Sequence, residues 1–154
     1  MPTHRSGKAS GLTIVECLVV LAVLGVVAGG AAFVWPRLAA AFRLEAGLHQ
    51  LAADLHDTRV LAVAAAARAR VVLARGAERY RLERADDDGT YTVTAERRLP
   101  PGVHVADVNS GGDLVFTARG NAENGTVVLA DGRGLRATLR LNQRGRVTVE
   151  RGRT

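Results

Sequence analysis

An apolar run close to the N-terminus constrains this chain more than any other feature. From Leu12 to Trp35 the ionisable side chains are Glu16 and Cys17 alone. A helix of these 24 residues is about 36 Å long at about 1.5 Å per residue, more than a hydrocarbon core of about 30 Å. The run therefore predicts a membrane-embedded helix over 12–35. A carboxylate inside such a helix costs about 2.5–3.5 kcal/mol, so Glu16 needs a partner or a function.

The segment before this run differs from an ordinary secretory signal. Residues 1–11 are polar, are basic through Arg5 and Lys8, and have no apolar stretch of their own. A signal peptide carries its apolar stretch before the cleavage site, whereas the plausible processing point here, Gly11, precedes it. Cleavage after Gly11 would leave the apolar helix on the mature protein. The basic leader and the otherwise uncharged apolar run predict that the N-terminus lies on the cytoplasmic side of the membrane.

Composition argues against metal, disulfide and catalytic chemistry. The chain has 154 residues, about one domain, and a formal charge of +6. Cys17 is the single cysteine, so an intrachain disulfide is excluded, and the four histidines form no cluster at ligand spacing. We find no nucleophile–base pair, no carboxylate pair and no glycine-rich phosphate loop. The sequence therefore predicts a protein that is not an enzyme and has no metal or cofactor.

After the apolar run, the pattern predicts one α+β head over 36–154. Pro36 marks an expected kink, and an amphipathic helix follows over about 37–69. Its apolar residues are expected to hold one face: Leu44, Leu48, Leu51, Leu55 and Val60. From about 70 to 150 the apolar residues alternate with polar ones, which is typical of strands, and turn residues separate these stretches. We expect a long N-terminal helix, membrane-embedded in its first half, packed on an antiparallel β-sheet.

The sequence Gly11-Leu12-Thr13-Ile14-Val15-Glu16, followed by the apolar run, resembles the leader junction of type IV prepilins and type II secretion pseudopilins. This resemblance implies that a prepilin peptidase cuts after Gly11 and N-methylates Leu12, where the family usually has Phe. It also implies that Glu16, at the fifth mature position, neutralises the N-terminal ammonium of an adjacent subunit during assembly. The alternative is an acid favoured by the helix dipole and reaching the membrane interface.

The later strands carry a second resemblance. The stretches LPPGVHV, DLVFTARGNAENGTVVLADG and LRATLRLNQRGRVTV are similar in order to the head of the GspH/FimT pseudopilins. The resemblance implies a pilin-like fold and a minor pseudopilin of the type II secretion system, placed near the tip of the periplasmic pseudopilus and assisting export of folded proteins. Its partners would be other major and minor pseudopilins or pilins. The alternative it leaves open is a FimT-like minor type IV pilin acting in pilus assembly or DNA uptake.

The C-terminal charge bears on that alternative. Residues 133–154 contain seven arginines and one acidic residue, Glu150. Four of these arginines are candidates for contacts with DNA phosphates: Arg144, Arg146, Arg151 and Arg153. We favour the alternative, a solvated face of the last hairpin, because the chain has one lysine among 21 basic residues, an arginine bias typical of a GC-rich genome.

Overall fold

The computed structural model describes residues 13–151, without the side chains of residues 31–34, 110 and 151. Gly11, Leu12 and Arg153, which the sequence singles out, lie outside the described residues. The chain divides into two compact units, Met1–Leu38 and Ala39–Thr154, and each is considered by itself.

The first unit contains the beginning of helix α1 (Ile14–Ala64). Thr13 caps this helix, because its Oγ1 accepts the Glu16 N–H at 3.2 Å and its carbonyl accepts the Cys17 N–H at 3.2 Å. Large apolar side chains are exposed here, and their exposed fractions range from 50% at Val20 to 81% at Ile14. Among the described residues, no single straight helix is both long enough and apolar enough to span a membrane. The helical stretches Ile14–Gly30 and Trp35–Ala64 meet these two criteria when they are taken together as a bent pair.

Helix α1 includes Pro36 and ends at Ala64, so the predicted end near residue 69 is wrong. The chain turns through Ala66, which adopts a left-handed conformation with φ 50°. The Ala67 N–H then bonds to the Ala62 carbonyl at 3.2 Å, the pattern that closes many helix ends. Glycine usually occupies this position, and an alanine there leaves no sequence signal for the end of the helix.

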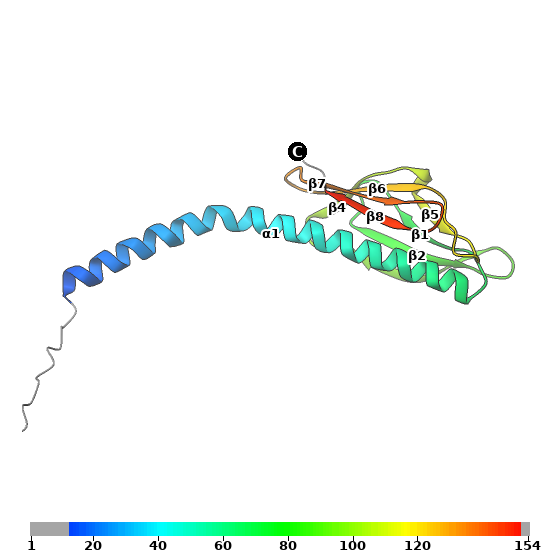
Figure 1. Ribbon diagram of the computed structural model, residues 1–154, viewed down its shortest axis with the longest axis horizontal. Coiled ribbons are helices and arrows are strands. Elements are labelled where there is room, and N and C mark those ends of the chain that lie inside the picture. The colour runs from blue at the N-terminus through cyan, green and yellow to red at the C-terminus, as the bar shows by residue number, and fades with distance from the viewer. Residues whose placement is uncertain (1–12, 152–154) are drawn as a thin grey trace, which may run out of the picture. The chain divides into compact units, whose positions relative to one another are not determined.

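The second unit contains two four-stranded antiparallel sheets rather than the single sheet that the sequence predicted (Figure 1). Sheet A has the order β3-β2-β1-β5, and its strands are β1 (Ala69–Leu73), β2 (Arg79–Ala85), β3 (Tyr91–Arg98) and β5 (Asp113–Phe116). Sheet B has the order β4-β6-β7-β8, and its strands are β4 (Val103–Val108), β6 (Gly125–Asp131), β7 (Arg136–Leu141) and β8 (Val147–Arg151). A short 3₁₀ turn, η1 (Ser110–Gly112), precedes β5.

One apolar core joins both sheets to the second half of α1, which runs along them (Figure 1). The helix contributes the stripe Leu44, Leu48, Leu51 and Leu55 at helical spacing, all at most 6% exposed. The prediction that Val60 shares this face is wrong, because Val60 is 53% exposed. The residues that meet this stripe come from alternate positions of the strands, among them Val71, Tyr80, Leu114, Phe116, Val105, Leu129 and Leu139. The head is therefore a helix covering two sheets, and the predicted α+β class is confirmed.

A buried polar cluster also joins α1 to sheet A. The Tyr80 hydroxyl donates to Asp54 Oδ2 and accepts a hydrogen bond from Gln50 Nε2 at 3.0 Å. Asp54 Oδ1 lies 3.5 Å from Arg97 Nε, and Gln50 also donates to the Arg98 carbonyl at 2.9 Å. Since Tyr80 and Asp54 are only 2% and 7% exposed, this cluster fixes how the helix sits on the sheet.

Candidate functional site

Glu16 occupies the third position of the first turn of α1. Its backbone N–H is the group that Thr13 caps, at 3.2 Å, so Thr13 and Glu16 stand at the spacing of a capping box. Both residues are exposed. A carboxylate here is favoured by the positive end of the helix dipole and remains open to a partner's cation. The geometry is compatible with either predicted role of Glu16.

Three of the arginines proposed for DNA, Arg144, Arg146 and Arg151, lie among the described residues. Arg144 and Arg146 lie in the turn between β7 and β8, where Asn142 Oδ1 accepts both of their N–H groups, at 3.1 and 2.9 Å. Arg151 ends β8, opposite Ala137. A five-residue strand puts Arg151 about 13 Å from the turn. Along the backbone, Arg151 therefore lies apart from Arg144 and Arg146, and Arg153 lies outside the described residues.

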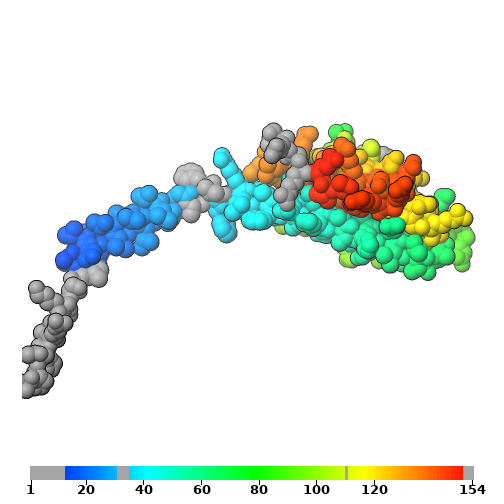
Figure 2. Space-filling view, viewed as in Figure 1, coloured from blue at the N-terminus to red at the C-terminus, as the bar shows by residue number. Residues whose placement is uncertain are grey.

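The turn that carries Arg144 and Arg146 meets a third arginine that the sequence reasoning missed. Arg59 of α1 donates from Nε to the Gly120 carbonyl at 2.9 Å. A Cβ on Gly145, whose φ is +71°, would lie 2.8 Å from Arg59 Nε and 2.7 Å from the Gly120 oxygen. The end of α1, the turn at Gly120 and the β7–β8 turn are thus in close contact, and their green, yellow and orange-red atoms adjoin in Figure 2. We call Arg59, Arg144 and Arg146, which these segments carry, the distal basic cluster. No sequence signal connects residue 59 with residues 144 and 146, because only tertiary packing brings them together.

Some C-terminal charge is neutralised within sheet B. Arg140 Nη1 lies 3.4 Å from Glu150 Oε1 across the β7–β8 pair. Among the residues that the structure describes, no group of three or more histidine, cysteine, aspartate or glutamate side chains is placed to hold a metal ion. His49 lies on the exposed surface of α1, 3.8 Å from Glu45, and His56 is exposed one heptad further on.

Residues 7–32 match the family model of the prokaryotic N-terminal methylation motif. The head and helix are similar to the minor pseudopilin EpsH from the type 2 secretion system of Vibrio cholerae, with a TM-score of 0.62 and 12% identity over 71% of this chain and 97% of that one. They are also similar to the type IV minor pilin FimU of Pseudomonas aeruginosa, with a TM-score of 0.57 and 18% identity over 70% and 87% of the two chains. The fold is pilin-like. No curated protein matches by sequence.

The predictions of a prepilin-type N-terminus and of a pilin-like α+β fold are therefore confirmed. At 12% and 18% identity the two solved structures establish the fold of this pilin-like chain and not the system in which it works. One of them comes from a secretion pseudopilus and the other from a type IV pilus.

Proposed function

We propose that this chain is a minor pseudopilin of the type II secretion system, a structural subunit near the tip of the periplasmic pseudopilus that assists export of folded proteins. The proposal is supported by the presence of two features in one chain. These are the N-terminal methylation motif at 7–32 and a long helix whose second half packs on two small sheets. The secretion pseudopilin EpsH has this fold. The partners are other major and minor pseudopilins.

The proposal includes processing at Gly11. A prepilin peptidase of the inner membrane cleaves after Gly11 and methylates the new N-terminus, Leu12. The helix from Ile14, with its exposed apolar side chains, then anchors the mature chain with its N-terminus cytoplasmic and its head periplasmic until assembly extracts it. Mass spectrometry of the protein purified from membranes is expected to find a chain that begins at N-methyl-Leu12. A functional protein that retains Met1 would contradict this step.

Glu16 has the assembly role in this proposal, by pairing with the N-terminal ammonium of a neighbouring subunit. Two opposite charges attract far more strongly in a low dielectric than in water. Glu16→Ala makes the helix more apolar, so membrane insertion and cleavage at Gly11 are expected to stay normal while co-purification with partner pseudopilins falls. Glu123→Ala, which removes an exposed acid of the head, is the matched control. Equal co-purification of both variants with the partners would exclude the pairing role.

The choice of system is tested in the source bacterium. Deletion of the gene is expected to leave type II substrates in the periplasm and to leave DNA uptake unchanged. Complementation with the wild-type gene should restore the substrates to the culture medium, whereas the Glu16→Ala gene should not. If the deletion abolished natural transformation and left secretion normal, the chain would instead act as a minor type IV pilin.

The second candidate is a FimT-like minor type IV pilin that binds DNA, and the distal basic cluster is the observation that favours it. The backbone of the β7–β8 turn, which carries Arg144 and Arg146, lies against Arg59 of α1, so three basic residues from two elements lie on neighbouring segments that a phosphate backbone could contact. In this case the full-length protein in detergent micelles should retard duplex DNA at low salt. Replacing Arg144 and Arg146 by glutamine should make the logarithmic salt slope shallower by about 1.8, at about 0.9 per phosphate contact.

The matched comparison is the pair Arg151→Gln and Arg153→Gln, since Arg151 lies at the other end of β8. This double variant is expected to retain most of the DNA affinity. Equal losses in the two double variants would indicate a diffuse attraction to positive charge and no DNA site at the distal basic cluster.

A further inference from the structure

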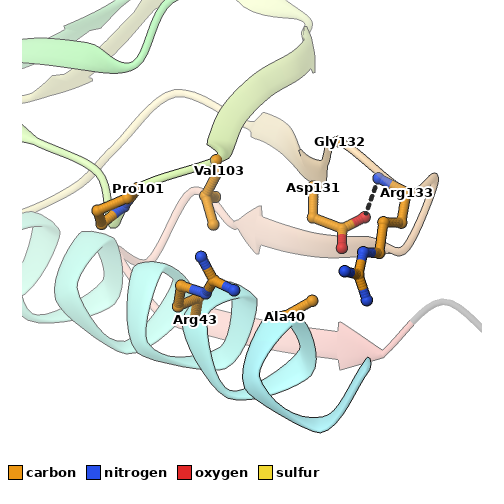
Figure 3. A pocket seen from close by; sticks show the side chains of 8 residues that line it. Ala40, Arg43, Pro101, Val103, Asp131, Gly132 and Arg133 are labelled. Atoms are coloured by element: carbon orange, nitrogen blue, oxygen red, sulfur yellow. Dashed lines mark hydrogen bonds between the residues drawn. The ribbon is translucent and has the colours of Figure 1, made fainter. Parts of the chain in front are cut away.

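A cavity of about 300 Å³ lies between α1 and the turn that joins β6 to β7 (Figure 3). Arg43 of α1 forms one wall, Asp131 and Arg133 of the β6–β7 turn form the opposite wall, and the Pro101–Val103 turn closes the side. All of these residues belong to the second unit. Three charged side chains from two separate elements thus meet at one cavity, at the lower end of the size range of ligand pockets.

Asp131 is buried with only half of its hydrogen-bonding capacity used. The residue is 6% exposed. Its Oδ1 accepts the backbone N–H groups of Arg133 and Leu135 at 3.0 and 2.8 Å, which holds the turn in shape. Its Oδ2 is buried and has no hydrogen-bond partner among the described residues. An unsatisfied buried acceptor costs about 1–3 kcal/mol, and more when it is charged, so this oxygen requires an explanation.

The two arginines that line the cavity, Arg43 and Arg133, do not provide that partner. Arg43 uses its Nε to donate to the Ala39 carbonyl at 3.1 Å, and its terminal nitrogens face the cavity in Figure 3. The guanidinium of Arg133 lies on the other side of the same space (Figure 3). Both side chains are exposed and can adjust to a ligand. A simple cation in the cavity would meet two positive charges, whereas a fully deprotonated anion would meet the buried carboxylate.

The ligand that fits these groups is an anion that carries its own proton donor. We propose that the cavity binds a protonated phosphate group, with its charged oxygens on Arg43 and Arg133 and, once binding uncovers this buried oxygen, its P–OH donating to Asp131 Oδ2. Guanidinium forks match phosphate oxygens in geometry, and a carboxylate accepts a hydroxyl proton strongly. A phosphate monoester has a second pKa of about 6, so its protonated form is abundant at mildly acidic pH. The free phosphate ion and a phosphate monoester headgroup of a lipid share this chemistry.

Phosphate and sulfate are the probes that test the role of Asp131. Both are tetrahedral oxyanions, but sulfate carries no proton at pH 6. Isothermal titration calorimetry of the full-length protein in dodecyl maltoside micelles, at pH 6 and constant ionic strength, is expected to give an affinity for sodium phosphate about tenfold or more above that for sodium sulfate. Equal affinities for the two anions, or no binding of either, would overturn the proposal.

Variants separate the three contacts. Asp131→Asn keeps an oxygen for the two turn N–H groups but presents an amide donor to the cavity, so the preference for phosphate over sulfate should disappear or reverse. Arg43→Gln and Arg133→Gln should each weaken phosphate binding about tenfold. Arg119→Gln, an exposed arginine outside the cavity, is the charge control and should leave the affinity unchanged. A loss of affinity as large in Arg119→Gln as in Arg43→Gln would refute the site.

The source of the phosphate is decided with lipids. Mixed micelles that contain phosphatidic acid offer a monoester with a P–OH group, whereas phosphatidylglycerol offers a diester without one. Tighter binding of phosphatidic acid than of inorganic phosphate, lost in Asp131→Asn, would assign the site to a lipid headgroup. Tighter binding of inorganic phosphate would assign it to a soluble phosphate. Binding of phosphatidylglycerol equal to that of phosphatidic acid would contradict the role of Asp131 Oδ2.

Discussion

Replacing Tyr80 by phenylalanine tests whether the buried polar cluster fixes α1 on sheet A. The substitution removes the hydroxyl that donates to Asp54 Oδ2 and leaves the ring packed in the core. Asp54 retains Arg97 at 3.5 Å, and Gln50 retains the Arg98 carbonyl at 2.9 Å. A hydrogen bond to a charged group contributes about 1.5–3 kcal/mol, so we expect Tyr80→Phe to lower the free energy of unfolding by that amount.

The same hydroxyl makes stability depend on alkaline pH. Burial and the neighbouring Asp54 carboxylate raise the pKa of Tyr80 above its ordinary value of 10.0. The folded protein therefore holds this proton more tightly than the unfolded chain does. The contribution to stability is complete below pH 10 and is lost as pH rises above it, by up to about 1.4 kcal/mol per pH unit.

Thermal and urea unfolding of the full-length protein, followed by far-ultraviolet circular dichroism in detergent micelles from pH 8 to about 11, measures both effects. Tyr91→Phe is the matched control, because Tyr91 is the other tyrosine of the chain and its ring stacks on Arg70 at 3.9 Å, a contact that phenylalanine keeps. The Tyr80→Phe variant should lose the alkaline decline and Tyr91→Phe should keep it. Equal stability of Tyr80→Phe and the wild type, with the same decline above pH 10, would refute the reasoning.

Two further substitutions test the packing of the head. Gly112→Ala places a Cβ 2.5 Å from the Leu73 carbonyl oxygen at φ +94°. It should destabilise the head more than Gly89→Ala, which has a similar φ of +84° but no atom close to the added Cβ. The difference between the urea midpoints of the two variants measures the cost of the steric clash. Leu51→Ala, at a position with no exposure, should cost about 2–5 kcal/mol, whereas Val60→Ala, at 53% exposed, should cost about 0.5 kcal/mol or less. Similar melting temperatures for Leu51→Ala and Val60→Ala would contradict the placement of the core.

Local sequence patterns predicted the elements well because each pattern reflects the surface that the element buries. Alternation around Tyr80 and Leu82 predicts β2, and both side chains face the core. The stripe that begins at Leu44 and Leu48 predicts the core face of α1. The glycine at residue 145 marks the β7–β8 turn, where φ is positive. In each case the signal and the structure lie within a few residues of each other.

Long-range pairing was not predictable in the same way. Strand β1 pairs with β5, so Ala69 lies opposite Phe116, and β4 belongs to the other sheet although it falls between them in sequence. Alternation tells which side of a strand is apolar but not which strand lies beside it. The prediction of a single sheet was therefore wrong, because the strands form two sheets. For the same reason the sequence did not predict the contact of Arg59 with Gly120, which are more than 30 residues apart. It also did not predict that Asp131 Oδ2 has no hydrogen-bond partner among the described residues, because that depends on how the surrounding side chains pack.

The two halves of α1 show why one helix can belong to two surroundings. From Ile14 to Val27 large apolar side chains occur on every face and are exposed, which is the composition that lipid or neighbouring apolar helices require. From Leu44 onward the apolar residues are confined to one stripe, and Asp54 is held by Tyr80. In the proposed assembly from membrane to filament, the first half exchanges one apolar environment for another at little cost. Its second half keeps a fixed partner within the same chain, so the head can remain folded throughout that exchange.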